Sequence, residues 1–145
     1  MLSRILVPTD GSELSNKAVG AAVELAVRLK ATLVGMTVTE PYPYPHMARH
    51  SPVEGHAQYE ARMKEEAEER LAMFRKAVAS VGIAEETVIK SAASAFEAIL
   101  EVARDRGCDG IIMASHGRRG LSGMLLGSET QKVLTHSTIP VLVIR

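Results

Sequence analysis

The sequence is poor in several residue types, and each shortage argues against a class of function. It has no tryptophan and five other aromatic residues, three tyrosines and two phenylalanines, so a surface that binds nucleic-acid bases by stacking is not expected. Its 17 basic and 17 acidic side chains cancel, which also argues against a nucleic-acid surface. No apolar run approaches the roughly 20 residues that cross a bilayer, so membrane association is not expected.

The single cysteine, Cys108, limits redox and metal chemistry. One thiol cannot form an internal disulfide, and Cys108 does not belong to a metal-binding cluster of cysteines. Free cysteines are mostly buried and inert, so we expect Cys108 to pack beside the strand that follows it; a reactive thiol is the alternative. Met1 to Arg4 lead straight into an apolar strand without a signal-peptide pattern, so we expect a cytoplasmic protein.

The spacing of apolar residues predicts strands and helices in alternation. Short apolar runs predict strands, and apolar residues at helical spacing predict helices. The expected strands cover residues 5–8, 31–39, 86–90, 108–115 and 139–145, and the expected helices cover residues 13–30, 63–81, 94–107 and 128–136. This order predicts a single doubly wound α/β domain over residues 1–145. Its five-stranded parallel sheet would have the Rossmann-like order 3-2-1-4-5, with helices on both faces.

Local motifs predict where some helices begin and end. Ser94-Ala-Phe-Glu97 and Ser128-Glu-Thr-Gln131 have the spacing of a capping box, in which the serine hydroxyl and the glutamate or glutamine side chain each satisfy a backbone donor. Gly82 is expected to end the second helix. The charged run at residues 64–70 is typical of a solvent-exposed helical face, not of an acidic site.

The stretch between the second strand and the second helix breaks the pattern. Four prolines lie between residues 40 and 52 and disfavour both helix and strand, which predicts a long exposed loop. His46, His50 and His56 lie in or next to it without a fixed spacing. We therefore expect solvated histidines rather than metal ligands. Long loops often cover a ligand or a partner, which is a possible role for this one.

The stretch after the fourth strand is rich in glycine. Residues 113–128 include Gly117, Gly120, Gly123, Gly127, Arg118 and Arg119, and residues 116–128 include no acid. Glycine permits positive φ and close approach of the backbone to a ligand. Backbone N–H groups that point into such a loop, next to a helix N-terminus, bind phosphate oxygens. The stretch therefore predicts an anion-binding loop, and a flexible surface loop is the alternative.

A second candidate loop, Thr9-Asp-Gly-Ser12, follows the first strand. It should open at the same rim of the sheet, where open α/β sheets bind ligands. Asp10 could accept hydrogen bonds from a ribose or help to hold a divalent cation; a turn-forming or helix-capping aspartate is the alternative. Motifs for a P-loop, a dinucleotide site, an esterase or a zinc protease do not occur. No catalytic residue is therefore assigned, and we expect His116 to serve binding rather than catalysis.

Four segments together resemble the universal stress protein family: Val7-Pro-Thr-Asp-Gly-Ser12, Met113-Ala-Ser-His-Gly117, Leu125-Leu-Gly-Ser128 and Ile139-Pro-Val-Leu-Val-Ile144. They span the whole chain in the family's order. The nucleotide-binding branch of that family carries Gly-x2-Gly-x9-Gly-[Ser/Thr]. Gly117, Gly127 and Ser128 match this pattern, whereas Ala114 replaces its first glycine. The extra methyl group would narrow the approach of the backbone to a phosphate.

The resemblance implies a site for an adenine nucleotide, ATP with Mg²⁺. Pro8, Thr9 and Asp10 would flank the adenine and ribose, with Asp10 as the ribose or metal contact, and Val38 would meet the adenine through its backbone. The residues implied around the phosphates are Ala114, Gly117, Arg118, Gly127, Ser128 and Glu129, and Met113 completes the implied nucleotide-binding set. The resemblance also implies a homodimer through residues 139–145.

The function favoured by these residues is that of a cytoplasmic stress-response module that binds ATP as a signal, with at most weak hydrolysis. A dimeric interaction module of the same family without nucleotide is one alternative, suggested by Ala114 and by the loop at residues 41–56. A slow ATP hydrolase that uses His116 is another. All three functions are compatible with the same fold, because one fold serves many functions. They differ in whether the nucleotide site, and any catalytic site, is complete.

Overall fold

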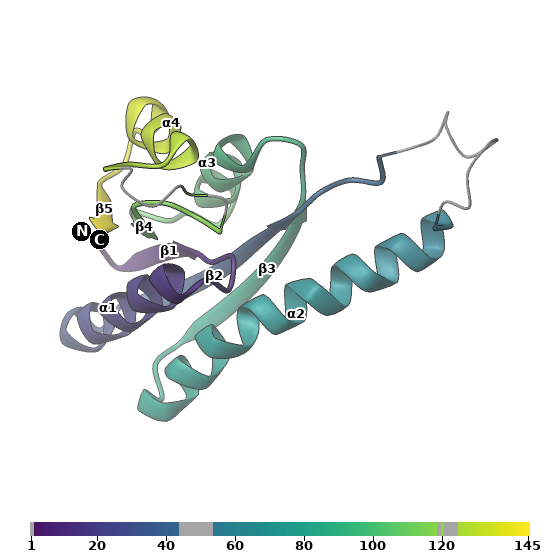
Figure 1. Ribbon diagram of the computed structural model, residues 1–145. Coiled ribbons are helices and arrows are strands. Elements are labelled where there is room, and N and C mark those ends of the chain that lie inside the picture. The colour runs from purple at the N-terminus through teal and green to yellow at the C-terminus, as the bar shows by residue number, and fades with distance from the viewer. Residues whose placement is uncertain (1, 44–53, 119, 121–124) are drawn as a thin grey trace.

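Strands and helices alternate along the chain in the computed structural model (Figure 1). The structure describes residues 2–43, 54–118, 120 and 125–145. The strands are β1 (Arg4–Pro8), β2 (Thr32–Thr39), β3 (Glu85–Ser91), β4 (Gly110–Ala114) and β5 (Val141–Ile144), and the helices are α1 (Glu13–Leu29), α2 (His56–Val81), α3 (Ala95–Asp105) and α4 (Ser128–His136). The predicted succession of elements is confirmed.

The five strands form one parallel sheet in the order β3-β2-β1-β4-β5. This confirms the predicted fold class. β1 and β4 are neighbours at the centre of the sheet. From β1 the chain proceeds toward the β3 edge, and from β4 it proceeds toward the β5 edge. The point where the strand order reverses therefore lies between the carboxyl ends of β1 and β4, where such sheets bind ligands.

Two helices cover each face of the sheet (Figure 1). On one face, Ile5 and Val7 of β1 pack with residues of α1 and with Phe74 and Val78 of α2. On the other face, Leu6 packs with residues of α3 and with Val133 of α4. Successive residues of a strand point to opposite faces, so β1 contributes to both cores. The two cores hold the carboxyl ends of β1 and β4 in place.

The ends of two helices differ from the sequence-based expectation. Ser94 is the N-cap of α3, but its side chain makes no capping hydrogen bond. The N-cap of α4 is Gly127 rather than Ser128, and it has no side chain to cap the helix. Both predicted capping boxes are therefore wrong. A partner from another helix, described below, serves α3 in place of Ser94, whereas the predicted C-cap Gly82 is confirmed, with φ +67°.

α2 extends well past the sheet beside the chain that leaves β2 (Figure 1). Tyr59 ties these two segments together, because its hydroxyl donates to the carbonyl of Glu40 at 2.9 Å and its ring lies 5.4 Å from that of Tyr42. His56 is the first residue of α2, and its ring also contacts Tyr42. His46 and His50, and with them most of the expected long loop, lie outside the described residues.

Two further observations bear on the composition-based expectations. No helix in the described part of the chain is both long and apolar enough to cross a membrane. Cys108 is buried just before β4, as expected, and this burial raises the pKa of its thiol. A raised pKa keeps the thiol protonated and poorly nucleophilic.

Candidate functional site

The loops after β1 and β4 are in direct contact at the rim of the sheet. Asp10, two residues past β1, accepts a hydrogen bond from the backbone N–H of Arg118 through Oδ2 at 2.6 Å. Its other oxygen, Oδ1, accepts from the N–H of Ser12 at 2.9 Å. The hydrogen bond from Ser12 is local, two residues along the chain, and is the turn-forming role expected of Asp10 from the sequence. The Arg118 contact is a tertiary one, and it places the carboxylate against the glycine-rich loop.

The hydrogen bonds at Asp10 stabilise its charged form. Burial acts to raise the pKa of the carboxyl, but hydrogen bonds from Ser12, Arg118 and Ser15 outweigh that effect and hold the pKa below its ordinary value. A carboxylate that accepts several N–H hydrogen bonds typically has a depressed pKa. Asp10 is therefore ionised at neutral pH, and its negative charge lies beside the loop predicted to bind phosphate.

Gly117 allows the two loops to approach. A Cβ atom built on Gly117 would lie 2.8 Å from Oδ2 of Asp10, closer than Cβ atoms are found to oxygen. Any other residue would push the carboxylate away from the Arg118 N–H. The requirement for glycine at position 117 is one of space, because positive φ values occur at Gly11, Gly82 and Gly107 and not at Gly117.

His116 occupies space inside the loop. A Cβ atom on Gly120 would lie 2.7 Å from Cδ2 of His116, and one on Gly127 would lie 3.1 Å from its Cβ. The His116 Nδ1 lies 3.2 Å from the hydroxyl of Ser115. Gly127 also donates its N–H to the carbonyl of Ser115 at 2.6 Å. The two glycines therefore let the chain fold back around the histidine. Gly123 and Arg119 lie outside the described residues.

The start of α4 closes the far side of the site. Ser128, the first residue of this helix, is exposed. Thr130 is buried and donates its hydroxyl hydrogen to the carbonyl of Ala114 at 3.0 Å, which fixes α4 against the end of β4. The N-terminal end of a helix carries a partial positive charge and favours anions. The predicted residues Met113 and Ala114 are buried in β4 beneath this helix end.

The side chain of Glu129 faces another helix. Its Oε2 accepts a hydrogen bond from the N–H of Phe96 at 2.8 Å, at the start of α3, and its Oε1 pairs with Lys132. Glu129 thus supplies the cap that Ser94 does not. A carboxylate engaged with α3 and with Lys132 leaves only the backbone of Glu129 for a ligand at the rim.

Thr9 and Pro8 form the floor of the site. Pro8 is the last residue of β1 and pairs with Met36 of β2. Thr9 is buried, donates its N–H to the carbonyl of Met36 at 2.8 Å and places its hydroxyl 3.0 Å from that of Ser15. These contacts direct the Thr9 side chain into the protein, where it supports the loop after β1.

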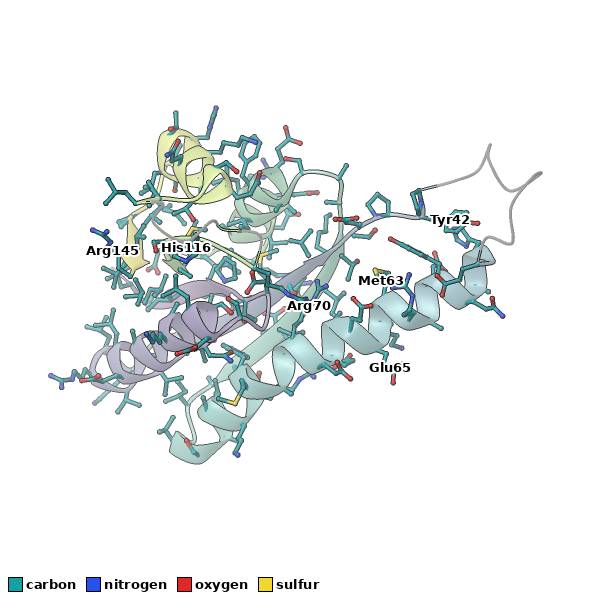
Figure 2. The ribbon with its side chains drawn as sticks, in the orientation of Figure 1. Tyr42, Met63, Glu65, Arg70, His116 and Arg145 are labelled. Carbon is teal, nitrogen blue, oxygen red and sulfur yellow. The ribbon has the colours of Figure 1, made fainter. Side chains whose placement is uncertain are left out.

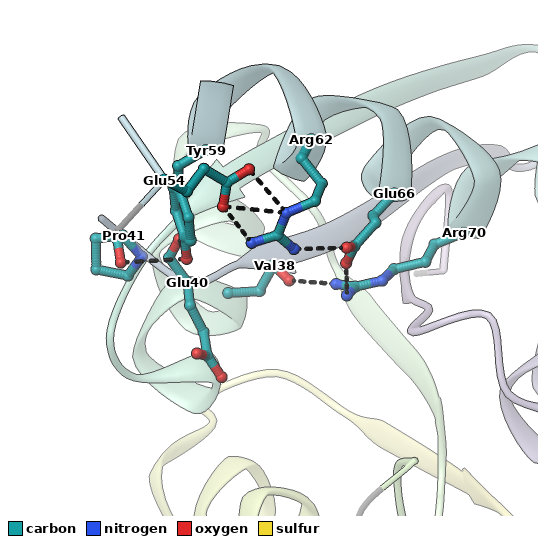
Figure 3. Close-up of polar contacts among 8 residues, drawn as sticks. All are labelled: Val38, Glu40, Pro41, Glu54, Tyr59, Arg62, Glu66 and Arg70. Carbon is teal, nitrogen blue, oxygen red and sulfur yellow. Dashed lines mark hydrogen bonds and ion pairs between the residues drawn. The ribbon is translucent and has the colours of Figure 1, made fainter. Parts of the chain in front are cut away.

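Val38 lies near the end of β2, where its carbonyl oxygen accepts a hydrogen bond from Nη1 of Arg70 at 3.0 Å (Figure 3). Sequence reasoning had assigned Arg70 to the charged, solvent-exposed face of α2, and this assignment is wrong. Arg70 reaches from α2 toward the sheet and is labelled in Figure 2. A usable signal was present, because Ala67, Arg70 and Phe74 follow the i, i+3, i+7 spacing of a buried helix face.

A hollow lies away from this rim, farther out along α2. It has a volume of about 330 Å³ and lies between the segment that leaves β2 and the first half of α2. Its lining includes Tyr42, Tyr59, Met63 and Ile89. Figure 2 shows Arg70 between His116 and Met63 in this view, with Tyr42 farther out beside the first turns of α2. The sequence contained no motif that marks this groove.

No metal-binding cluster accompanies Asp10 in the part of the chain that the structure describes, where groups of three or more His, Cys, Asp or Glu side chains that could hold an ion are absent. A single carboxylate does not make a Mg²⁺ site by itself. Mg²⁺ commonly binds through one or two carboxylates together with phosphate oxygens of a ligand. The donor set is therefore compatible with a metal ion that arrives with a nucleotide.

Similarity to known proteins covers the entire chain. The model of the universal stress protein family matches residues 1–145. Universal stress protein YxiE of Bacillus subtilis is 33% identical over 149 aligned residues, which cover 100% of both chains. The structure of universal stress protein UspA from Lactobacillus plantarum superimposes with a TM-score of 0.83 and 25% identity, over 99% of this chain and 98% of that one.

A third relative was solved with a ligand. It is a universal stress protein in complex with cAMP, which has 25% identity and a TM-score of 0.66 over 99% of this chain and 97% of its own. These likenesses agree with the parallel sheet and its strand order. The chain belongs to the universal stress protein family.

Proposed function

We propose that this stress protein binds ATP at the rim between β1 and β4, and that nucleotide occupancy serves as a signal, with hydrolysis slow or absent. The observation that carries the proposal is the contact of the Asp10 carboxylate with the Arg118 N–H at 2.6 Å, beside the start of α4. It places a candidate ribose or metal ligand next to a glycine-rich loop and a helix N-terminus. A relative with 25% identity was solved in complex with cAMP, which supports an adenine nucleotide as the ligand.

Each part of the nucleotide would meet a different element. The adenine and ribose would lie over Pro8, Thr9 and Asp10, with the base reaching the backbone of Val38. The phosphates would lie along the glycine-rich loop, near Ala114, Gly117 and Arg118, and at the first turn of α4, near Gly127, Ser128 and Glu129. Phosphate at a helix N-terminus would take over the role of the side-chain cap that Gly127 lacks.

Mg²⁺ would allow the Asp10 carboxylate and the phosphates to lie close together. The ionised carboxylate already accepts the Arg118 N–H, so a phosphate that took this donor would bring two anions together. A divalent cation held between Asp10 and phosphate oxygens would offset their repulsion. The proposal therefore expects ATP to bind more tightly with Mg²⁺ than without it.

Calorimetric titration with ATP, with and without Mg²⁺, tests the proposal, together with thermal unfolding. A ligand at about 100 times its dissociation constant stabilises a protein by about 2.7 kcal/mol, which raises the melting temperature measurably. The expected result is binding heat and a raised melting temperature that both increase with Mg²⁺. Absence of heat and of any thermal shift at millimolar ATP would remove the nucleotide from the proposal.

The proposal extends to assembly and location. We expect a cytoplasmic homodimer that forms through residues 139–145. β5 is an edge strand of the sheet, and Leu142 on it is exposed. An exposed apolar edge strand favours pairing with another chain.

An interaction module without nucleotide is the second candidate. It is favoured by Ala114 at the position of the motif glycine and by His116, which fills space inside the loop. If this candidate is correct, Ala114→Gly should gain ATP binding that the unaltered protein lacks. Equal ATP affinity of the two proteins would reject it.

A further inference from the structure

β2 continues past the end of β1, so Val38 lies beyond the last residue pair of these two strands. Pro8 pairs with Met36, and Thr9 donates its N–H to the Met36 carbonyl. In a parallel sheet, alternate residues of a strand direct their backbone groups to the same neighbouring strand. Val38 therefore directs its N–H and carbonyl toward the side on which β1 has ended. In the proposed function, this is the edge that meets the base.

Arg70 holds the Val38 carbonyl. Its Nη1 donates to that oxygen at 3.0 Å and its Nη2 donates to Glu66 at 3.2 Å (Figure 3). Its stem packs on the loop after β1, where a Cβ atom on Gly11 would lie 3.2 Å from its Cγ. Glu66 is held in turn by Arg62, which also pairs with Glu54. The guanidinium is therefore fixed at the base end of the site.

The guanidinium of Arg70 is mostly buried. Its Nε has no hydrogen-bond partner among the described residues and is itself buried, so a ligand at the rim does not reach that nitrogen. The side chain as a whole is 18% exposed, and Nη1 and Nη2 each carry a second N–H that their bonds to Val38 and Glu66 do not use. The Val38 carbonyl, the acceptor at this edge, is already engaged by Nη1.

Purines differ in what they present to such an edge. Adenine carries a 6-amino donor, whereas guanine carries a 6-oxo acceptor. A free backbone carbonyl would accept the amino group of adenine and repel the oxygen of guanine. A guanidinium held over that carbonyl competes with the amino group and can donate to the oxygen. Sites that hydrogen-bond one substituent of a ligand discriminate strongly against ligands in which it is replaced. Whether the Val38 carbonyl is free or bonded to Arg70 should therefore affect the preference between adenine and guanine.

We propose that Arg70 is a specificity-determining residue of the nucleotide site, and that it reduces the preference for adenine over 6-oxopurines such as guanine. The inference rests on the proposed nucleotide function, because Val38 meets a base only if a nucleotide binds at this rim. It makes the site a purine nucleotide sensor with weak base selectivity.

The test is the ratio of the dissociation constants of GTP and ATP, measured with Mg²⁺ for the unaltered protein and for Arg70→Met. A methionine preserves packing against Gly11 and removes the donors. The unaltered protein should bind the two nucleotides within about tenfold of each other. Arg70→Met should shift the ratio toward ATP by about tenfold, the effect of one hydrogen bond to a charged group. The ratio cancels effects on the shared triphosphate.

Arg75→Met is the matched control, because Arg75 lies on the same helix and contacts Glu68 and Thr87 instead of the rim. It should leave the ratio unchanged. Inorganic triphosphate should compete equally with nucleotide in all three proteins. A ratio that is unchanged in Arg70→Met, or shifted toward GTP, would overturn the inference and leave the proposed function intact. Should Arg70→Met fail to fold, a preference of the unaltered protein for ATP above about a hundredfold would overturn it. A lack of binding of any nucleotide would overturn both.

Discussion

At the scale of single residues, position 117 couples the two loops of the site through its lack of a side chain. Gly117→Ala would place a Cβ atom 2.8 Å from Oδ2 of Asp10 and displace the carboxylate from the Arg118 N–H. We expect this variant to lose about 1 kcal/mol of stability, the net value of a hydrogen bond, because position 117 is exposed and the bond lost is that from the Arg118 N–H to Asp10. Urea unfolding of the purified variant measures the loss, and the ATP titration should show weakened binding.

Gly20→Ala is the control for that substitution. Gly20 lies on the exposed side of α1, and a Cβ atom there meets no neighbour within 4 Å. Alanine favours a helix over glycine by about 1 kcal/mol, so this variant should be more stable than the unaltered protein. Equal destabilisation by the two substitutions would contradict the role assigned to Gly117.

Asp109 supplies a prediction on pH. It accepts hydrogen bonds from the N–H groups of Ser3 and Arg4, which anchor the start of β1 beside β4. Burial acts to raise the pKa of Asp109, but these hydrogen bonds lower it to about 2 from an ordinary value of 3.8. Because the folded pKa is depressed, the stabilisation is complete well above pH 4 and is lost as the pH falls toward 2.

Asp109→Asn should therefore cost about 1 kcal/mol at pH 7, a value reduced for the solvent exposure of this carboxylate. The difference from the unaltered protein should shrink steadily between pH 4 and pH 2. Urea unfolding at pH 7, 4, 3 and 2.5 measures it. A difference that stays constant over this range would exclude Asp109 as a source of acid sensitivity.

At the scale of elements, α3 and α4 are joined by one carboxylate. Glu129 of α4 caps the first turn of α3 through the Phe96 N–H at 2.8 Å, while Ser94 makes no capping bond. Loss of a helix N-cap costs about 1 kcal/mol. We expect Glu129→Ala to lose about this amount in thermal or urea unfolding, with faster amide exchange in the first turn of α3.

Lys132→Met separates capping from ion pairing. It removes the ion pair of Lys132 with Glu129 at 3.2 Å and the contact of the Lys132 ammonium with the Phe96 ring at 5.4 Å, and it keeps the hydrogen bond from the Phe96 N–H to Glu129. Exposed ion pairs are worth little, so Lys132→Met should change stability by less than about 0.5 kcal/mol. Comparable losses in the two variants would mean that the ion pair, and not the cap, carries the stabilisation.

At the scale of the whole molecule, the proposed dimer places β5 at its interface. Leu142 on β5 is 47% exposed, and Val27 on α1, outside the proposed interface strand, is 46% exposed. Leu142→Glu should produce monomers, because it brings two charges into an apolar contact. Val27→Glu, matched in exposure and chemistry, should remain a dimer. Sedimentation equilibrium distinguishes the two, and an unaltered protein that is monomeric at all concentrations would reject the dimer itself.

Much of the fold was accessible from the sequence because it depends on local spacing. Apolar residues at helical and strand spacing located the helices and strands, and their alternation predicted a doubly wound parallel sheet, since crossover connections between parallel strands have one hand. The two loops at the rim were also identifiable. Asp10 and Gly117 follow strands that are neighbours in the sheet, so the strand order alone brings them together.

The sequence by itself therefore determined the order of the elements, the sheet and the two loops, since each depends on residues close together in the chain or on general rules of connection. Only the tertiary structure decided which side chains fill and cap these elements. Glu129 caps a helix start 33 residues away, and Arg70 reaches a carbonyl 32 residues away. The spacing of Ala67, Arg70 and Phe74 indicates the buried face of α2, but the partner that each side chain reaches depends on how helices pack across the sheet, and no local spacing encodes that packing.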